Sequence, residues 1–508
     1  MSHKTLVGGT AYNITGGKTL VGGTVYNISK GKTLVGGTGY SINFAPGLYA
    51  MLYTDGDMVF QLNSSVESGK TLSNSYKIIA NTSYQYNVLP WYNDKLSIKK
   101  VRFKNLIKPV EMGYWFTRAN NLTNFNSYNL DLNSITNMHL TFSDCANLTG
   151  SPICGTNVTD MTQLYHGCVK LTGSPVCGNK VIYMNYAYYN CTNLTGKPVC
   201  GDNVIYMNYA YDKCANLTGS PVCGDNVIYM SYTYRNCINL TGKPVCGDKV
   251  MYMSYTYFNC YRLTGNPVCG NNVIHMNYAY QGCTNLTGNP VCGDNVIYMF
   301  STYNNCTNLT GKPVCGDNVI DMRHTYRYCT NLTGKPVCGD NVIDIHDAYR
   351  NCANLTGSPV CGDNVTNFAY TYYNCYRLTG NPVCGDNVTN FAFAYNNCTN
   401  LTGSPVCGNN VINMRSAYHN CTNLYGNAYF YSNNVKNVQN CFRKRNTSKR
   451  LNIYVHNGST TLNTCLNGSM PGARLTWIND SACHYNTQYN LYIYPVSNVA
   501  ATRSANGD

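Results

Sequence analysis

Cysteines are the residues of this sequence whose number and spacing could carry chemistry. The chain has 28 of them in 508 residues, and most belong to two series that repeat every 23 residues. In the unit CTNLTGKPVCGDNVIYMNYAYDK (residues 191–213), the second cysteine follows the first by nine residues, and the next unit begins fourteen residues later. Metal sites, disulfides and rows of small buried side chains are the three interpretations of such a pattern.

The spacing and the N-terminus favour the last interpretation. Zinc sites usually place about two to four residues between paired cysteines, and no histidine column accompanies this repeat, so we expect no metal and no cofactor. The N-terminus MSHKTLVGGTAYNITGG lacks the apolar segment of a Sec signal, which predicts synthesis in a reducing bacterial cytoplasm. We therefore expect reduced cysteine ladders that line the repeat, represented by Cys145, Cys168, Cys191, Cys214 and Cys237 in one series and Cys154, Cys177, Cys200, Cys223 and Cys246 in the other.

No catalytic constellation is visible elsewhere. The nine histidines share no fixed sequence relation to a cysteine, serine or acidic partner, and the 22 acidic residues lie mostly on one repeated turn position. A carboxylate pair for glycoside hydrolysis is therefore not expected, and the VGG turns lack the Lys-Ser/Thr of a phosphate-binding loop. We expect a protein that is not an enzyme.

The elements that position these residues follow from the period. Residues 145–424 repeat C-x-N-L-T-G-x-P-V-C-G-D-N-V-I-x-M-x-x-A-Y-x-x, and a fixed period of this length predicts stacked coils. We expect a mainly β, leucine-rich-repeat-like solenoid of about twelve coils. In residues 191–213, Leu194, Val199, Val204 and Met207 are expected to point inward, and Ala210-Tyr211 to form a short helical or 3₁₀ turn.

Small β-rich regions are expected on both sides of the array. Residues 1–45 contain three 14-residue units beginning KTLVGGT, each predicted to be a strand, a Gly-Gly turn and a second strand, and together an attachment segment. Residues 46–144 predict a β-rich domain with an N-terminal solenoid cap, and residues 425–508 a β-rich C-terminal domain or cap.

Charge and hydropathy narrow the partners. The net charge is +14, although only 11% of residues are charged, and basic runs occur at 94–108 and 442–450. Solvated basic faces explain such runs, and attraction to anionic polymers is the alternative. We do not expect nucleic-acid binding. No apolar run reaches the length of a membrane span, so no membrane insertion is expected.

Candidate binding residues occupy two repeated positions that change between units while the apolar positions do not. An exposed Tyr/Asn face suits sugar or protein recognition, because tyrosine gives a rigid amphipathic contact surface; simple coverage of a strand surface is the alternative. The candidates are Tyr183, Tyr206, Tyr229, Tyr252 and Tyr298 at one position, and Tyr186, Tyr209, Tyr232, Tyr255 and Tyr278 at the other.

The unit itself resembles a known repeat. LTGSPVCGNKVIYMNYAYYNC (171–191) is similar to the Treponema-type, BspA-like leucine-rich repeat, with Ala187-Tyr188 at the place of the family's A-F turn and Cys191 as its closing cysteine. The resemblance covers about residues 110–424. The sequence departs from the family where Lys197, Ser220 and Asn266 stand at an apolar strand position.

This family includes bacterial surface adhesins and proteins of gut Firmicutes phages and prophages, and the KTLVGGT units and the segment YNLYIYPVSNV are similar to parts of phage structural proteins. The resemblance implies a phage virion structural protein, in a tail, fibre or baseplate, that adheres to the host surface. It implies contacts with other virion proteins through the N-terminal region, a host glycan or protein as ligand, a homo-oligomer, and a location in the virion or outside the cell after lysis. A bacterial surface adhesin and a non-binding virion decoration or spacer are the alternatives.

Overall fold

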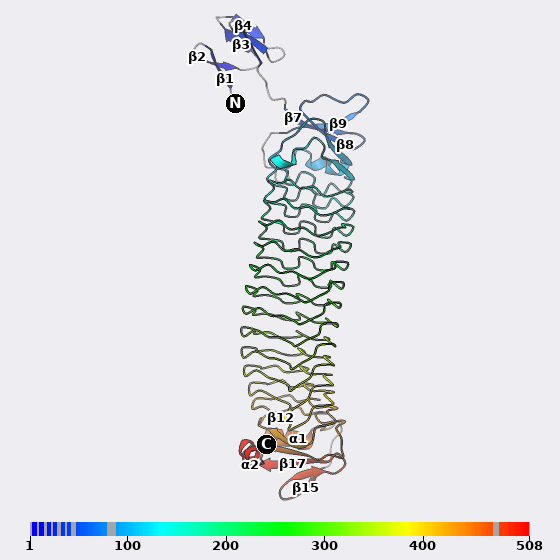
Figure 1. The fold of residues 1–508 in the computed structure, drawn as a ribbon, viewed down its shortest axis with the longest axis vertical. Helices are drawn as coiled ribbons and strands as arrows, with labels where there is room; N and C mark the ends of the chain where they lie inside the picture. Colours follow the sequence, from blue (N-terminus) through cyan, green and yellow to red (C-terminus); the bar gives the residue numbers. More distant parts are fainter. Residues whose placement is uncertain are drawn as a thin grey trace.

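The computed structural model describes residues 47–78, 88–470 and 477–506, and before residue 47 only the backbone of six short strands. Within this described part the fold is mainly β, and α-helix occurs only in α1 (Thr460–Asn467) and α2 (Val499–Ala505), both beyond the repeats. Figure 1 shows an elongated molecule in which successive turns of the chain lie one above another.

The strand–turn–strand pattern of residues 4–45 corresponds to three antiparallel hairpins. They pair β1 (His3–Val7) with β2 (Thr10–Ile14), β3 (Lys18–Val21) with β4 (Thr24–Asn27), and β5 (Lys32–Val35) with β6 (Thr38–Ser41). Nothing in this backbone arrangement bears on the predicted attachment role.

A five-stranded sheet precedes the repeats, with the order β11-β10-β8-β7-β9. Its strands are β7 (Leu48–Tyr53), β8 (Asp57–Gln61), β9 (Leu72–Ile78), β10 (Lys100–Phe103) and β11 (Asn124–Asn126), and the 3₁₀ helix η2 (Tyr92–Ser97) lies between β9 and β10. β7 and β8 form an antiparallel hairpin, whereas β10 is parallel to both β8 and β11. This change from antiparallel to parallel pairing starts the direction in which all the later turns are stacked.

The repeats form a column that we call the repeat stack (residues 107–437). Parallel bridges join Ile107 to Leu130 and Glu111 to Asn137, then continue from Asn137 in steps of 23 residues to Asn413, which pairs with Asn437. The short 3₁₀ helix η3 (Leu132–Ser134) lies in an early turn. Parallel pairing begins before the first repeated cysteine, because the turns at 107–144 already stack in the same register.

A chain of β-turns, rather than a helical turn, connects each bridge to the next cysteine. In residues 184–191, the N–H groups of Ala187, Tyr189 and Cys191 donate three residues back along the chain. The alternate N–H groups of Met184, Tyr186 and Tyr188 donate instead to carbonyls 22 residues ahead, in the following turn. The predicted helical or 3₁₀ turn is therefore wrong, because half of its donors pair with the next turn of the stack.

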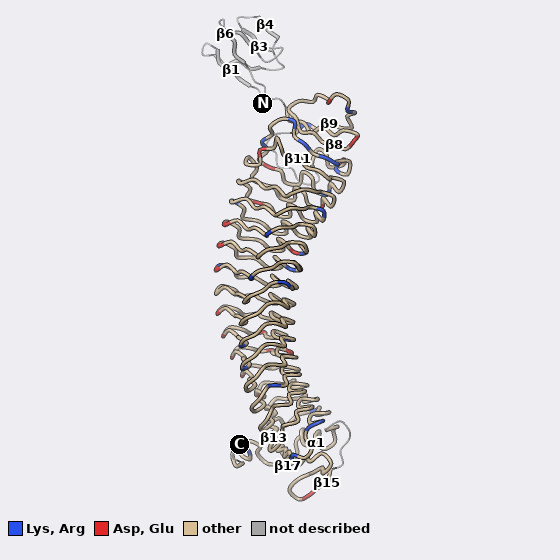
Figure 2. Tube along the Cα trace, turned by 45° about the vertical axis from the view of Figure 1, so that its right-hand side comes forward, with Lys and Arg blue, Asp and Glu red and all other residues tan. Residues whose placement is uncertain are grey.

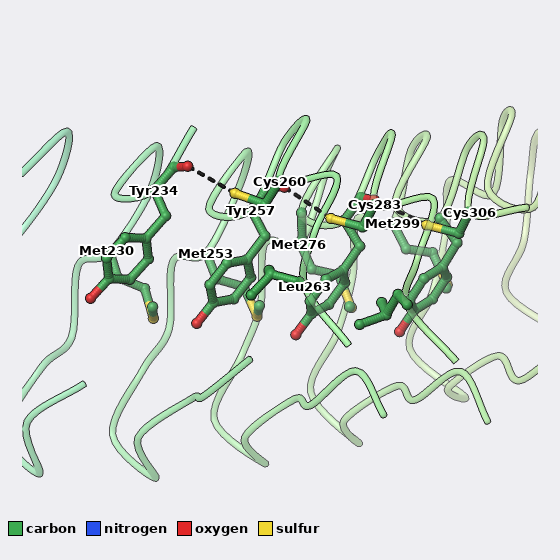
Figure 3. Close-up of a cluster of buried hydrophobic side chains, with 14 of the residues drawn as sticks. Met230, Tyr234, Met253, Tyr257, Cys260, Leu263, Met276, Cys283, Met299 and Cys306 are labelled. Carbon is green, nitrogen blue, oxygen red and sulfur yellow. Dashed lines mark hydrogen bonds between the residues drawn. The ribbon is translucent and has the colours of Figure 1, made fainter. Parts of the chain in front are cut away.

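The core of the stack is a set of apolar columns, each with one residue per turn. Figure 3 shows methionine, tyrosine, leucine and cysteine side chains repeating along this core. Leu194, Val204 and Met207 are buried as expected, whereas Val199 is only half-buried and its neighbour Pro198 is buried instead. The expectation for Val199 is wrong because its N–H and C=O are both bound by the hydroxyl of Tyr211, which fills the core at this level.

A six-stranded sheet follows the stack, with the order β12-β13-β14-β17-β16-β15. Its strands are β12 (Val406–Cys407), β13 (Gly426–Phe430), β14 (Leu451–His456), β15 (Ile478–Asn479), β16 (His484–Asn486) and β17 (Leu491–Val496). The pairs from β12 to β17 are parallel, and β16 and β15 then run antiparallel. Among the described residues, no helix has the length and apolar character needed to cross a membrane.

Candidate binding face

The first predicted tyrosine position forms a continuous stack on the surface, which we call the outer column: Tyr183, Tyr206, Tyr229, Tyr252, His275 and Tyr298. Each of these residues is the bridge residue of its turn, so the backbone ladder sets their spacing. Neighbouring ring centroids lie 4.9–5.3 Å apart, with the rings near parallel. Tyr183 is 43% exposed, and its successors are half-buried by one another.

The second predicted position forms the turn column: Tyr186, Tyr209, Tyr232, Tyr255 and Tyr278. The backbone of all five is left-handed, with φ between 55° and 63°. A non-glycine residue rarely adopts this conformation. The rings stack at 4.2–4.5 Å, closer than in the outer column, so the stacking compensates for an unfavourable backbone. Burial, together with the neighbouring Tyr232 and Tyr186 hydroxyls, raises the pKa of Tyr209 to about 12.

Stacking determines which parts of these tyrosines a ligand can reach. Each ring within a column has a neighbouring ring on both faces, so only the ring edges and the phenol hydroxyls remain accessible. A sugar can lie flat on a ring face only at the end of a column. The two columns therefore present rows of hydroxyl groups with one group per turn, and this arrangement suits hydrogen bonding to a polar chain.

The chemistry of the face changes along the molecule. After Tyr298 the outer column continues as Asp321, Asp344, Asn367, Asn390 and Asn413, and after Tyr278 the turn column continues as Ser301, His324 and Asp347. Figure 2 shows charged residues thinly scattered along the stack. Several of these charges form pairs on this face. Arg323 binds Asp321 through both carboxylate oxygens and packs on Phe300, with its guanidinium 4.7 Å from the ring centroid.

The position three residues after the turn column adds a buried ion pair. Asp212 is fully buried, and Arg235 in the next turn donates to both of its carboxylate oxygens. Burial raises the pKa of Asp212, against the opposing effect of Arg235. The same guanidinium lies 4.9 Å from the ring centroid of Tyr232, and so the ion pair connects to the turn column.

Histidines on this face have acidic partners, contrary to the sequence-based expectation. His139 lies 3.8 Å from Asp160, His166 lies 3.1 Å from Asp144, His324 lies 3.7 Å from Asp347, and His346 lies 2.8 Å from Asp344. In three of the four pairs the partner is 21 to 23 residues away, which is one turn of the stack. Searching for partners at the repeat period, rather than nearby in sequence, would have found them.

The two cysteine series occupy different environments, and all 28 cysteines, which lie within the described residues, are free. The series of Cys145, Cys168, Cys191, Cys214 and Cys237 is buried, and each thiol donates to a carbonyl of the preceding turn; Cys191 Sγ, for example, lies 3.0 Å from the Tyr165 carbonyl. The same bonds join Cys260 to Tyr234 and Cys283 to Tyr257 in Figure 3. These thiols act as backbone-bonding core groups.

The second series, which includes Cys154, Cys177, Cys200, Cys223 and Cys246, is half-buried. Each sulfur lies about 3.6 Å from the carbonyl of the following glycine, as in Cys200 with Gly201. Burial raises the pKa of Cys177 to about 11 and that of Cys200 to about 12. Such thiols are protonated at neutral pH and therefore poor nucleophiles and metal ligands.

A third tyrosine column, missed by the sequence reasoning, runs through the core from Tyr165 to Tyr418. Its rings are buried and stack at 5.4–5.7 Å. Each hydroxyl bridges to the far side of its own turn: Tyr257 Oη accepts from the Val245 N–H and donates to the Val245 carbonyl. This column fixes the cross-section of the stack. Its signal was the invariant tyrosine before each closing cysteine, which was taken as part of a helical turn.

An apolar groove was also missed. Its floor is a column of half-exposed isoleucines and its wall a column of asparagines, and the main part has a volume of about 1050 Å³. Representative lining residues are Ile274, Ile297, Ile320, Asn295 and Asn318. Each asparagine donates to a carbonyl of the preceding turn, as Asn318 does to Asp294. The signal was the Val-Ile pair of each unit, since adjacent residues of an extended segment cannot both point inward.

Comparison of the chain with protein-family models and with curated proteins gives no match.

Proposed function

We propose that this chain is a phage virion structural protein, in a tail, fibre or baseplate, whose leucine-rich-repeat-like solenoid adheres to the host surface. The observation that supports it best is the contrast between an unchanging core and a changing face. Buried Leu, Val, Tyr and Cys columns repeat almost identically, whereas the outer and turn columns pass from Tyr to His, Asp, Ser and Asn. A frame that holds variable side chains at fixed spacing suits recognition of an extended ligand.

The ligand best suited to this face is a host-surface glycan. Rows of phenol hydroxyls, asparagine amides and paired arginines offer hydrogen bonds at a regular interval along the molecule. Each contact would be weak, and binding strength would come from several contacts on one chain and from several chains in one particle. In this proposal residues 1–45 contact other virion proteins, the chain is a homo-oligomer, and neither membrane insertion nor nucleic-acid binding is involved.

The test removes hydroxyls without removing the stack. The triple variant Tyr206→Phe/Tyr229→Phe/Tyr252→Phe keeps the rings and loses three hydroxyls, and the corresponding triple alanine variant also loses the rings. We expect weaker binding to host cells and to purified wall polysaccharide by both variants, measured by pull-down and by biolayer interferometry. Tyr261→Phe/Tyr376→Phe, at exposed tyrosines of another column, is the matched control.

Unchanged binding by both triple variants would contradict recognition through the outer column. A bacterial adhesin would bind in the same way, so immunogold electron microscopy of particles from an induced lysate distinguishes the two: label on virions supports the phage protein. A decoration or spacer predicts no host binding by the isolated wild-type chain.

A further inference from the structure

Three side chains from two successive turns come together on the variable face, within the stretch where tyrosine gives way to charged residues. They are His324 and Asp347 of the turn column and His346, which precedes Asp347 in the chain. One nitrogen or carboxylate oxygen from each lies within 4.8 Å of the others. Two histidines and one carboxylate are a common set of ligands for a divalent transition metal.

The His324–Asp347 contact is unusual for a hydrogen bond. Nδ1 of His324 is buried and has no hydrogen-bond partner, and it lies 3.7 Å from Oδ2 of Asp347, too far to donate. Two ligand atoms of a tetrahedral zinc ion lie about 3.4 Å apart, given Zn–N and Zn–O bonds of about 2.1 Å. The separation therefore suits two atoms that share a cation.

Asp347 has one oxygen left for such a cation. Its Oδ1 accepts from Arg350 Nη1 at 3.1 Å, whereas Oδ2 faces His324. Burial lowers the pKa of His324, and the nearby positive charges of Arg323 and Arg327 act in the same direction, against Asp347. The imidazole is thus neutral at pH 7, the form that binds a metal.

The second histidine is oriented by a carboxylate of its own. Nδ1 of His346 lies 2.8 Å from Oδ1 of Asp344, and Asp344 also accepts from the His346 backbone N–H. Burial raises the pKa of Asp344, but the hydrogen bonds from His346 outweigh this effect and lower it overall. The ionised carboxylate can only accept, so the proton of His346 lies on Nδ1 and Nε2 is left as a ligand. Metal-binding histidines usually have such a carboxylate partner.

We propose that His324, His346 and Asp347 form a binding site for Zn²⁺ or a similar divalent transition cation, with Asp344 orienting His346. The cation joins two successive turns of the stack. Three protein ligands leave one coordination position for water or for an anionic group from solution. Mg²⁺ and Ca²⁺ prefer oxygen ligands and are not expected to bind here.

The experiment uses the full-length chain without an affinity tag, kept reduced, with Zn²⁺ and Co²⁺ as probes. Competition with a chromogenic chelator is expected to show one more Zn²⁺ equivalent in the wild type than in His324→Ala/His346→Ala. The thermal midpoint of the wild type, but not of the double variant, should rise with Zn²⁺. Asp344→Asn should weaken Zn²⁺ binding about tenfold to a hundredfold.

His139→Ala is the matched control. His139 also has an unpartnered Nδ1 and a carboxylate at 3.8 Å, but it belongs to no such three-residue cluster within the described residues. This variant should keep the full Zn²⁺ stoichiometry, and its circular dichroism, like that of the other variants, should match the wild type. Equal Zn²⁺ binding by the wild type and the double variant would overturn the proposal. So would a Co²⁺ spectrum with thiolate charge-transfer bands, because the cysteines would then be the ligands.

Discussion

At the scale of single residues, the same amino acid has different roles at different positions of the repeat. Tyr252 stacks on the surface, Tyr255 stacks on a left-handed backbone, and Tyr257 bridges the core through its hydroxyl. The difference comes from the direction of each side chain relative to the stack, and it determines which hydroxyls are available to a ligand.

The contrast between Tyr257 and Tyr252 gives a stability prediction. Tyr257→Phe leaves the N–H and C=O of Val245 without their hydroxyl partner in a buried site, so we expect a loss of about 1–3 kcal/mol in the free energy of unfolding. Tyr252→Phe, on the outer column, should change it by less than about 0.5 kcal/mol. Urea denaturation followed by circular dichroism measures both. Equal effects would show that the core hydroxyl adds nothing.

At the scale of elements, each turn of the stack is closed by its neighbours. The glycine after the second cysteine shows how close they are: a Cβ added to Gly178 would lie 2.3 Å from the carbonyl oxygen of Gly155, a backbone atom of the preceding turn. Glycine is therefore required here by the approach of two backbones, although its φ is an ordinary one.

A graded effect of alanine substitution follows from these distances. Gly178→Ala forces the two turns apart and should lower the free energy of unfolding by about 1–3 kcal/mol. Gly385→Ala occupies the same position of the repeat, but its nearest atoms are Cys361 Sγ at 3.0 Å and the Gly362 oxygen at 3.3 Å, so its effect should be smaller. Denaturant titration of the two variants provides the comparison. A larger loss for Gly385→Ala would contradict the explanation.

How far the sequence predicts the molecule also depends on this neighbour relation. The 23-residue period predicts the stacking and the inward positions of Leu194, Val204 and Met207, because these depend on local pattern alone. It does not predict that Tyr211 crosses the core, which depends on the size of the cross-section. The His324–Asp347 pair was missed because its members are one turn apart, and the tyrosine candidates were identified because each is repeated in several units.

At the scale of the whole molecule, the repeated burial of thiols and phenols makes stability depend on alkaline pH. Burial raises the pKa of Cys177 from 9.0 to about 11 and that of Cys200 to about 12, and that of the core tyrosines well above 10.0. Unfolded thiols ionise near pH 9, before the folded ones, so the folded state holds more protons above that pH. The stabilisation is complete below pH 9 and is lost as pH rises through 11–12.

We therefore expect the urea midpoint of the reduced protein to be flat from pH 7 to 8.5 and to fall steeply above pH 9. Each thiol contributes a slope of about 1.4 kcal/mol per pH unit between its unfolded and folded pKa values. Replacing Cys177, Cys200 and Cys223 with alanine should lower stability at pH 7 and reduce this slope. A midpoint unchanged up to pH 10.5 would contradict the assignment.

The reversal of strand direction in the C-terminal sheet has a consequence for assembly. A column of parallel turns ends in a row of unpaired N–H and C=O groups, and such an edge can pair with another copy of the same chain and grow into a filament. Here β16 and β15 run antiparallel to β17, and the outermost strand, β15, spans only two residues. The sheet thus ends the column with a short edge of the opposite direction, which hinders end-to-end polymerisation and keeps the length of the molecule equal to its number of turns.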